Sequence, residues 1–93
     1  MYSLEFKSSV KKDLKKVEIS DIKFLKKSLE VFIENFSYEY EIELMKTGKI
    51  KKLVGEEELY RLRVRNYRVI YEKQQEKLVI LVVHIKSREG AYK

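Results

Sequence analysis

Two short runs of residues stand almost end to end in this chain. Tyr60–Arg65 alternates apolar or aromatic side chains with arginines, Tyr67–Lys73 keeps most of that pattern, and only Asn66 separates them. Such alternation is typical of a half-buried strand, and strands joined this closely must pair antiparallel. A third run, Leu78–Ile85, is apolar at every position but His84, as in a central strand buried on both faces. The three runs predict an antiparallel meander.

The turn between the first two strands sets their register. If Arg65 and Asn66 are the central residues of a tight turn, Arg63 lies opposite Arg68; we expect Asn66 to supply the positive φ, since arginine is less favoured there. Side chains two apart on a strand share a face. One face would then carry Arg61, Arg63 and Arg68, with Arg65 at its rim. The other face would be apolar or aromatic, with Tyr60, Leu62, Val64, Tyr67, Val69 and Tyr71.

The chain before the meander predicts one more strand and two helices. Tyr2, Leu4 and Phe6 alternate as in a strand. Ser8 or Ser9 can cap a short helix, and Ser20 a longer one in which apolar residues recur every three or four positions from Ile22 to Phe36.

The segment Ser37–Lys46 is ambiguous. It alternates like a strand, but it is rich in helix-forming residues and is followed by Gly48. We expect the helix to continue to near Thr47, with Lys49–Glu58 as a polar connector. The predicted fold class is α+β: a small antiparallel sheet, made of the N-terminal strand and the C-terminal meander, with two N-terminal helices packed on it. We expect residues 1–93 to form a single domain.

The net charge of the chain, +6, lies entirely in its last third. All five arginines fall between Arg61 and Arg88, whereas every earlier base is a lysine. The planar guanidinium grips phosphate in two places, so this change favours a phosphate-rich partner, nucleic acid first.

A purely structural account of the arginines is also available. Glutamates from Glu39–Glu43 or Glu56–Glu58 could fold across them, or the patch could be an ordinary solvated face. Against both, arginines directly opposite each other destabilise a sheet, and a bound polyanion would remove that penalty.

The composition excludes several chemistries. The chain has no cysteine and one histidine, and its carboxylates have no metal-ligand spacing, so we expect neither a metal nor another cofactor. His84 ends an apolar strand, where a histidine is more often a packed, hydrogen-bonded residue than a catalyst. Because the N-terminus is unlike a signal peptide and no apolar run could span a bilayer, we expect a cytoplasmic protein.

Arginines with a tyrosine can nonetheless cleave RNA without a metal. The substrate's own 2′-hydroxyl attacks the adjacent phosphorus, while the arginines position the phosphate and stabilise its developing charge. A tyrosine beside several cations can have its pKa lowered and accept a proton. DNA lacks the 2′-hydroxyl, so such a site would bind DNA without cutting it.

The segment Leu59–Glu72, followed by the apolar strand and Arg88-Glu-Gly-Ala-Tyr92, resembles the C-terminal half of the RelE/ParE toxin superfamily of type II toxin–antitoxin systems. Weaker similarities, in Phe6–Lys16 and Lys51–Gly55, extend the resemblance over essentially the whole chain. It implies the fold predicted above and, for RelE-like members, ribosome-dependent cleavage of mRNA in the A site.

The resemblance also implies roles for residues. Arg61 and Arg63 would hold the RNA backbone, Arg68 would stabilise the transition state, Arg88 would assist at the phosphate, and Tyr92 would transfer a proton or stack on a base. Around these catalytic residues, Arg65, Lys86 and Ser87 would contact RNA. Many relatives have His-Arg where this chain has Ser87-Arg88, so the acid–base contribution of that histidine is missing here. His84 would face away from Ser87 if the strand runs on.

The resemblance leaves alternatives open. ParE-type members share the fold but inhibit DNA gyrase, and a third possibility is an inert homologue that binds only antitoxin. The implied partners are a cognate antitoxin, mRNA and the ribosome, without a membrane or a metal.

Overall fold

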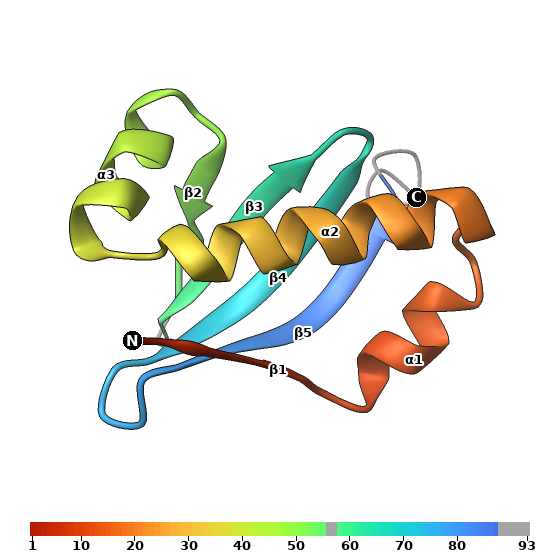
Figure 1. Ribbon diagram of the computed structural model, residues 1–93, viewed down its shortest axis with the longest axis horizontal. Coiled ribbons are helices and arrows are strands. Elements are labelled where there is room, and N and C mark those ends of the chain that lie inside the picture. Colours follow the sequence, from red (N-terminus) through yellow and green to blue (C-terminus); the bar gives the residue numbers. More distant parts are fainter. Residues whose placement is uncertain (56–57, 88–93) are drawn as a thin grey trace.

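The computed structural model describes residues 1–55 and 58–87, which form a five-stranded sheet and three helices. Along the chain these are β1 (Ser3–Phe6), α1 (Ser9–Leu14), α2 (Ile19–Asn35), α3 (Tyr38–Lys46), β2 (Ile50–Lys52), β3 (Leu59–Val64), β4 (Tyr67–Gln74) and β5 (Val79–Ser87). The sheet order is β1-β5-β4-β3-β2, and the helices pack on the sheet (Figure 1). The predicted α+β class is confirmed. None of the helices in the described residues is long and apolar enough to cross a membrane.

The hairpin of β3 and β4 has the predicted register. Val64 lies opposite Tyr67, Arg63 opposite Arg68, and Arg61 opposite Ile70. The turn differs in one detail, because Arg65 has the positive φ, 53°, and Asn66 does not. Arg65 therefore takes the left-handed backbone conformation that was expected of Asn66.

The strand partners differ from the prediction at both edges of the sheet. β1 pairs with β5 parallel, so the sheet is mixed, although its other three pairings are antiparallel. The helices between β1 and β5 supply the long connection that a parallel pair requires. The predicted connector Lys49–Glu58 contains β2, which pairs antiparallel with β3. Only Ile50 of that strand is buried, as expected of a short edge strand.

The helices begin and end differently from the prediction. α2 starts at Ile19, before the expected cap Ser20, and Glu18 at its N-cap makes no side-chain cap bond. The helical prediction for Ser37–Lys46 is confirmed, but α3 is a separate helix, because Phe36 is extended and Ser37 caps a new one. The Ser37 hydroxyl accepts the N–H of Tyr40 at 3.1 Å. Three helices therefore stand where two were predicted.

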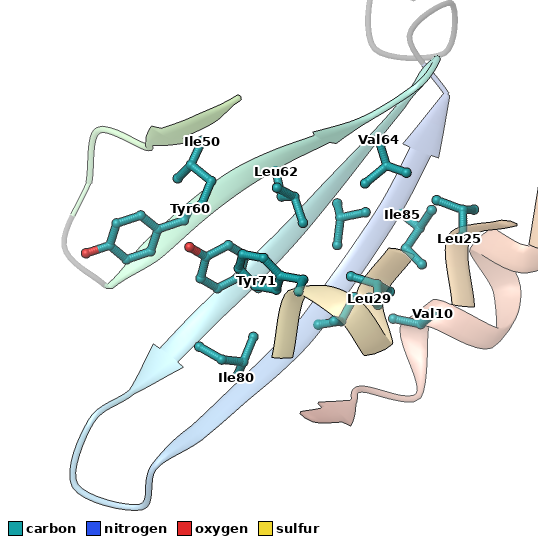
Figure 2. Close-up of a cluster of buried hydrophobic side chains, with 13 residues drawn as sticks. Val10, Leu25, Leu29, Ile50, Tyr60, Leu62, Val64, Tyr71, Ile80 and Ile85 are labelled. Atoms are coloured by element: carbon teal, nitrogen blue, oxygen red, sulfur yellow. The ribbon is translucent and has the colours of Figure 1, made fainter. Parts of the chain in front are cut away.

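One hydrophobic core lies between α2 and the sheet. α2 crosses in front of β3, β4 and β5 (Figure 1), and Figure 2 shows strand side chains such as Leu62, Val64 and Ile85 gathered with Leu25 and Leu29 of α2. The alternate strand residues, which point to the opposite face, are half-buried or exposed along β3. β5 is likewise buried mainly toward α2, and its half-buried Leu81 and Val83 do not fit the prediction of burial on both faces.

A buried polar cluster fixes α3 to the sheet. Glu41 is 2% exposed; its carboxylate accepts the Tyr71 hydroxyl at 2.7 Å and the Lys73 ammonium at 2.6 Å. Burial, and then the bond to Glu41, raises the pKa of Tyr71. Burial alone would lower the pKa of Lys73. The hydrogen bonds of Lys73 to Glu41 and Tyr60 outweigh this effect of burial, so the pKa of Lys73 is raised. The cluster therefore keeps a neutral tyrosine and an ion pair on the helix side of the sheet.

Candidate nucleic-acid interface

Basic side chains line up across four strands on the face of the sheet opposite α2. Arg63 of β3 lies opposite Arg68 of β4, which lies opposite Lys86 of β5. One row along, Lys51 of β2 lies opposite Arg61 of β3, and Ile70 lies between Arg61 and His84. Residues directly opposite one another share a face. We call this surface the arginine face; its basic residues are Lys51, Arg61, Arg63, Arg68, His84 and Lys86.

The charge on this face changes along the strands. The next row beyond Arg61 and Ile70 holds Leu59, Glu72 and Leu81, with Glu5 of β1 at its end. The bases thus occupy the half of the face nearest the β3–β4 turn, and two carboxylates occupy the other half. An anionic chain would be attracted to the end at the turn and repelled from the far end.

Two arginines of the face lack charge partners within the part of the chain that the structure describes. Neither Arg61 nor Arg63 forms a salt bridge with any described carboxylate. Arg61 Nε is in addition the one buried polar side-chain atom of the described residues without a hydrogen-bond partner. Leaving a buried donor unpaired costs about 1–3 kcal/mol.

The proposal that glutamates neutralise the arginines is wrong for the two best-placed candidates. Glu41 is engaged with Tyr71 and Lys73 on the other side of the sheet. Glu58 accepts the Tyr60 hydroxyl at 2.7 Å and lies 4.0 Å from Lys52, and that hydrogen bond with nearby lysines lowers the pKa of Glu58. The other two glutamates of Glu56–Glu58, Glu56 and Glu57, lie outside the described residues.

Two predicted RNA-binding residues are directed away from the arginine face. The Arg65 guanidinium stacks over the Phe24 ring of α2, 3.5 Å from its centroid, because the turn directs it to the helix side. Ser87 lies opposite Tyr67 and so shares that residue's face. His84 and Ser87 occupy opposite faces, as predicted. The remaining predicted residues Arg88 and Tyr92 lie outside the described residues.

The described tyrosines of the hairpin are poor proton acceptors near neutral pH. The hydrogen bond that Tyr67 donates to Asp21, 2.7 Å long, raises the pKa of Tyr67 to about 12. Burial raises the pKa of Tyr60, assisted by its bond to Glu58. All three hairpin tyrosines also lie on the helix side with the core residues. Within the described residues, the imidazole of His84 lies on the arginine face, opposite Ile70.

Sequence reasoning missed two members of this face. Lys51 was not predicted to lie on this face because β2 was not predicted. A lysine in a polar connector does not by itself indicate a binding site. His84 was expected to be packed and hydrogen-bonded; its Nδ1 does lie 3.1 Å from Asp13 of α1, but its side chain is 45% exposed. In the described segments, no three histidine, cysteine or acidic residues are grouped so that they could hold a metal ion.

Two comparisons with known proteins match this chain over nearly its whole length, and both matches are to toxins. A family model described as the ParE toxin of the type II toxin–antitoxin system parDE matches residues 4–92. A Methanocaldococcus jannaschii protein named "Putative toxin RelE1" is 33% identical over 92 residues, which cover 99% of this chain and 96% of that protein.

Solved structures of similar sequence share the fold. A chain of the RelB–RelE antitoxin–toxin complex from Methanococcus jannaschii is 28% identical with a TM-score of 0.69, covering 96% of this chain and 95% of its own length. A chain of the intact E. coli RelBE toxin–antitoxin complex is 26% identical with a TM-score of 0.66. The match covers 94% of this chain and 96% of the E. coli chain.

Proposed function

The chain belongs to the RelE/ParE family of type II toxin–antitoxin toxins, and we propose that it is an mRNA endoribonuclease that inhibits translation. In this proposal residues 1–93 act as one toxin domain in the cytoplasm, cut mRNA in the ribosomal A site without a metal or other cofactor, and are held inactive by a cognate antitoxin.

The observation that carries the proposal is the row of like charges across the sheet. Arg63, Arg68 and Lys86 occupy directly opposite positions on three neighbouring strands. Opposed like charges destabilise a sheet on their own, and Arg61 adds a buried donor without a partner in the described part of the chain. A chain of phosphates spaced along the row would offset the repulsion among these cations. RNA provides such phosphates and also the 2′-hydroxyl needed for metal-free cleavage.

The arginine face fits a division of labour in that reaction. Arg61 and Arg63 would hold the RNA backbone, and Lys51 and Lys86 extend the phosphate track to the two sides. Arg68, in the middle strand of the row, would stabilise the negative charge that gathers on the phosphate oxygens. Arg88 and Tyr92 keep the roles expected from the family resemblance. Arg65 and Ser87 are left out of the RNA track because they lie on the helix side.

Primer extension on a defined mRNA in a translating extract tests this proposal. The wild-type protein should produce cuts only when ribosomes translate the message, with a 2′,3′-cyclic phosphate on one new end and a 5′-hydroxyl on the other. Intact mRNA in the presence of folded protein would refute the nuclease assignment.

A gyrase inhibitor is the second candidate, and the matching family model favours it, because that model is named for ParE toxins. A gyrase inhibitor would block supercoiling by purified gyrase and leave mRNA intact. It would also tolerate Tyr92→Phe, whereas the nuclease would not. The two assays together separate the candidates, and a protein inactive in both would be the inert homologue.

The antitoxin is proposed to cover the helix side as well as the arginines. Phe6 is 51% exposed at the edge of a recess of about 320 Å³ between α1 and α2, lined by apolar side chains and by Lys7, Lys11 and Lys26. An amphipathic antitoxin segment with acidic residues would fill it. Co-expression with the product of the neighbouring gene, followed by size-exclusion chromatography, should give one stable complex. Separate elution of the two proteins would contradict the assignment.

A further inference from the structure

A β-bulge in β5 decides which face His84 occupies. Tyr71 lies opposite Val82 and Ile70 opposite His84, so Val83 is an extra residue without a partner on β4. Without the bulge, Val83 would lie opposite Ile70 and His84 would face the core. With it, Val82 and Ile85 are both buried at 0% and 3% exposure, and His84 joins the arginine face. Bulges of this kind commonly re-aim a side chain next to a functional site.

Two bonds from α1 fix the bulged segment. The Ser9 hydroxyl donates to the Val83 carbonyl at 2.6 Å, and Asp13 Oδ2 accepts the N–H of Ile85 at 2.9 Å. These bonds lie on either side of His84. They pair backbone groups of β5 at the edge of the sheet, beyond the point where β1 ends. His84 is therefore held by a helix and a strand, which position a side chain more precisely than a loop does.

Asp13 also sets the tautomer of His84. The same Oδ2 atom lies 3.1 Å from Nδ1 of the imidazole. A carboxylate can only accept, so the neutral ring carries its hydrogen on Nδ1 and leaves Nε2 as an acceptor. A base oriented by a carboxylate in this way is the recurrent arrangement of proton-transfer sites.

The charged neighbours of His84 come from three elements. Arg68 of β4 is its diagonal neighbour, at a separation of about 7–8 Å on a sheet. Lys86 is two residues along β5 on the same face. Asp13 comes from α1, and Lys16, in the turn after α1, lines a recess of about 140 Å³ together with Asp13 and Lys86. A phosphate bound by Arg68 and Lys86 would thus bring its ribose toward the imidazole.

We propose that His84 accepts the 2′-hydroxyl proton during RNA cleavage and that Asp13 is its positioning residue; the proposal rests on the nuclease function above. The 2′-O–H bond breaks and its proton moves to Nε2, while the 2′-oxygen forms a bond to phosphorus. The bond from phosphorus to the 5′-oxygen breaks, and the leaving oxygen takes a proton from the imidazolium or from water. The products are a 2′,3′-cyclic phosphate and a 5′-hydroxyl. This arrangement supplies the acid–base group that Ser87 lacks.

The test compares His84→Asn with wild type in the cleavage assay. Asparagine places an amide N–H where Nδ1 was, so the bond to Asp13 is kept and Nε2 is lost. We expect the cleavage rate to fall ~100-fold or more, the usual contribution of a general base. The pH–rate profile of the variant should also differ from that of the wild type, because the variant has lost the group that accepts the proton. Circular dichroism and the thermal midpoint should match those of the wild type.

The chain has only one histidine, so NMR of tag-free, ¹⁵N-histidine-labelled protein reads this ring alone. We expect the Nδ1–H tautomer in the wild type and a loss of that preference in Asp13→Asn. An Nε2–H tautomer in the wild type would overturn the proposal. So would equal rates and pH profiles for wild type and His84→Asn, and that outcome would leave the nuclease function standing. A wild type that does not cut RNA would refute both.

Discussion

Removing the charge of Arg63 should lower the salt dependence of RNA binding by a predictable amount. Five side chains of the arginine face are permanently charged: Lys51, Arg61, Arg63, Arg68 and Lys86. Each phosphate contact to single-stranded nucleic acid contributes about −0.7 to the slope of log K against log salt, so five contacts give about −3.5. Between about 50 and 200 mM salt the affinity should then fall roughly 130-fold. In Arg63→Gln the slope should be about −2.8 and the fall roughly 50-fold.

Fluorescence anisotropy with a labelled 2′-O-methyl oligoribonucleotide measures these slopes, because that RNA cannot be cut by 2′-hydroxyl attack. Lys26→Gln is the charge-matched control; it removes one exposed charge from α2, on the other side of the sheet. Arg65→Gln tests the placement of Arg65 over Phe24 and should also keep the wild-type slope. A flat salt dependence, or an equal change of slope in Arg63→Gln and Lys26→Gln, would refute this use of the arginine face.

Three further predictions concern stability. Glu41→Ala should destabilise the fold by about 3–5 kcal/mol in urea unfolding, because it leaves the Lys73 ammonium, whose side chain is only 9% exposed, without its partner; a loss below about 1 kcal/mol would contradict that. Tyr67 has its pKa raised to about 12 by the bond to Asp21. This bond should stabilise the fold fully below about pH 10 and cease to do so as the pH rises through 12, so Tyr67→Phe should abolish that alkaline loss. Gly48 has φ 82°, and a Cβ at this position would have no neighbouring atom within 4 Å. Gly48→Ala should therefore cost about 1 kcal/mol from backbone strain alone, and an unchanged thermal midpoint would disprove this.

Local sequence signals predicted the hairpin register and the helical segments, although not the helix boundaries, because each depends on residues close together in the chain. The alternation of Tyr60–Arg65 and the short link to Tyr67 favour one register, which places Tyr60, Leu62, Val64, Tyr67, Val69 and Tyr71 on one face, and the structure has it. The break at Phe36 was missed because Ser37 is a good cap inside a segment whose periodicity continues on both sides. The pairing of β1 with β5 joins segments more than seventy positions apart in the numbering, and nothing local specifies it.

The candidate site was predicted only in part, for a related reason. Arg61, Arg63 and Arg68 follow from the hairpin register. His84 does not, because Leu78–Ile85 is apolar on both faces and gives no alternation from which a bulge could be detected. Lys51 depends on the pairing of a short edge strand, and Arg65 depends on which turn residue takes the positive φ. Each of these positions is set by tertiary contacts.

The central claim is that RNA is cut on the arginine face. The most direct test compares how Arg68→Ala and Arg65→Ala cleave one mRNA, side by side in a translating extract. The two variants lose the same charge from the same hairpin, but Arg68 lies in the middle of the arginine face and Arg65 stacks on α2. We predict that primer extension shows the wild-type cuts with Arg65→Ala and none with Arg68→Ala, while both proteins remain folded. Equal cleavage by the two variants would contradict the assignment of the arginine face as the site where RNA is cut.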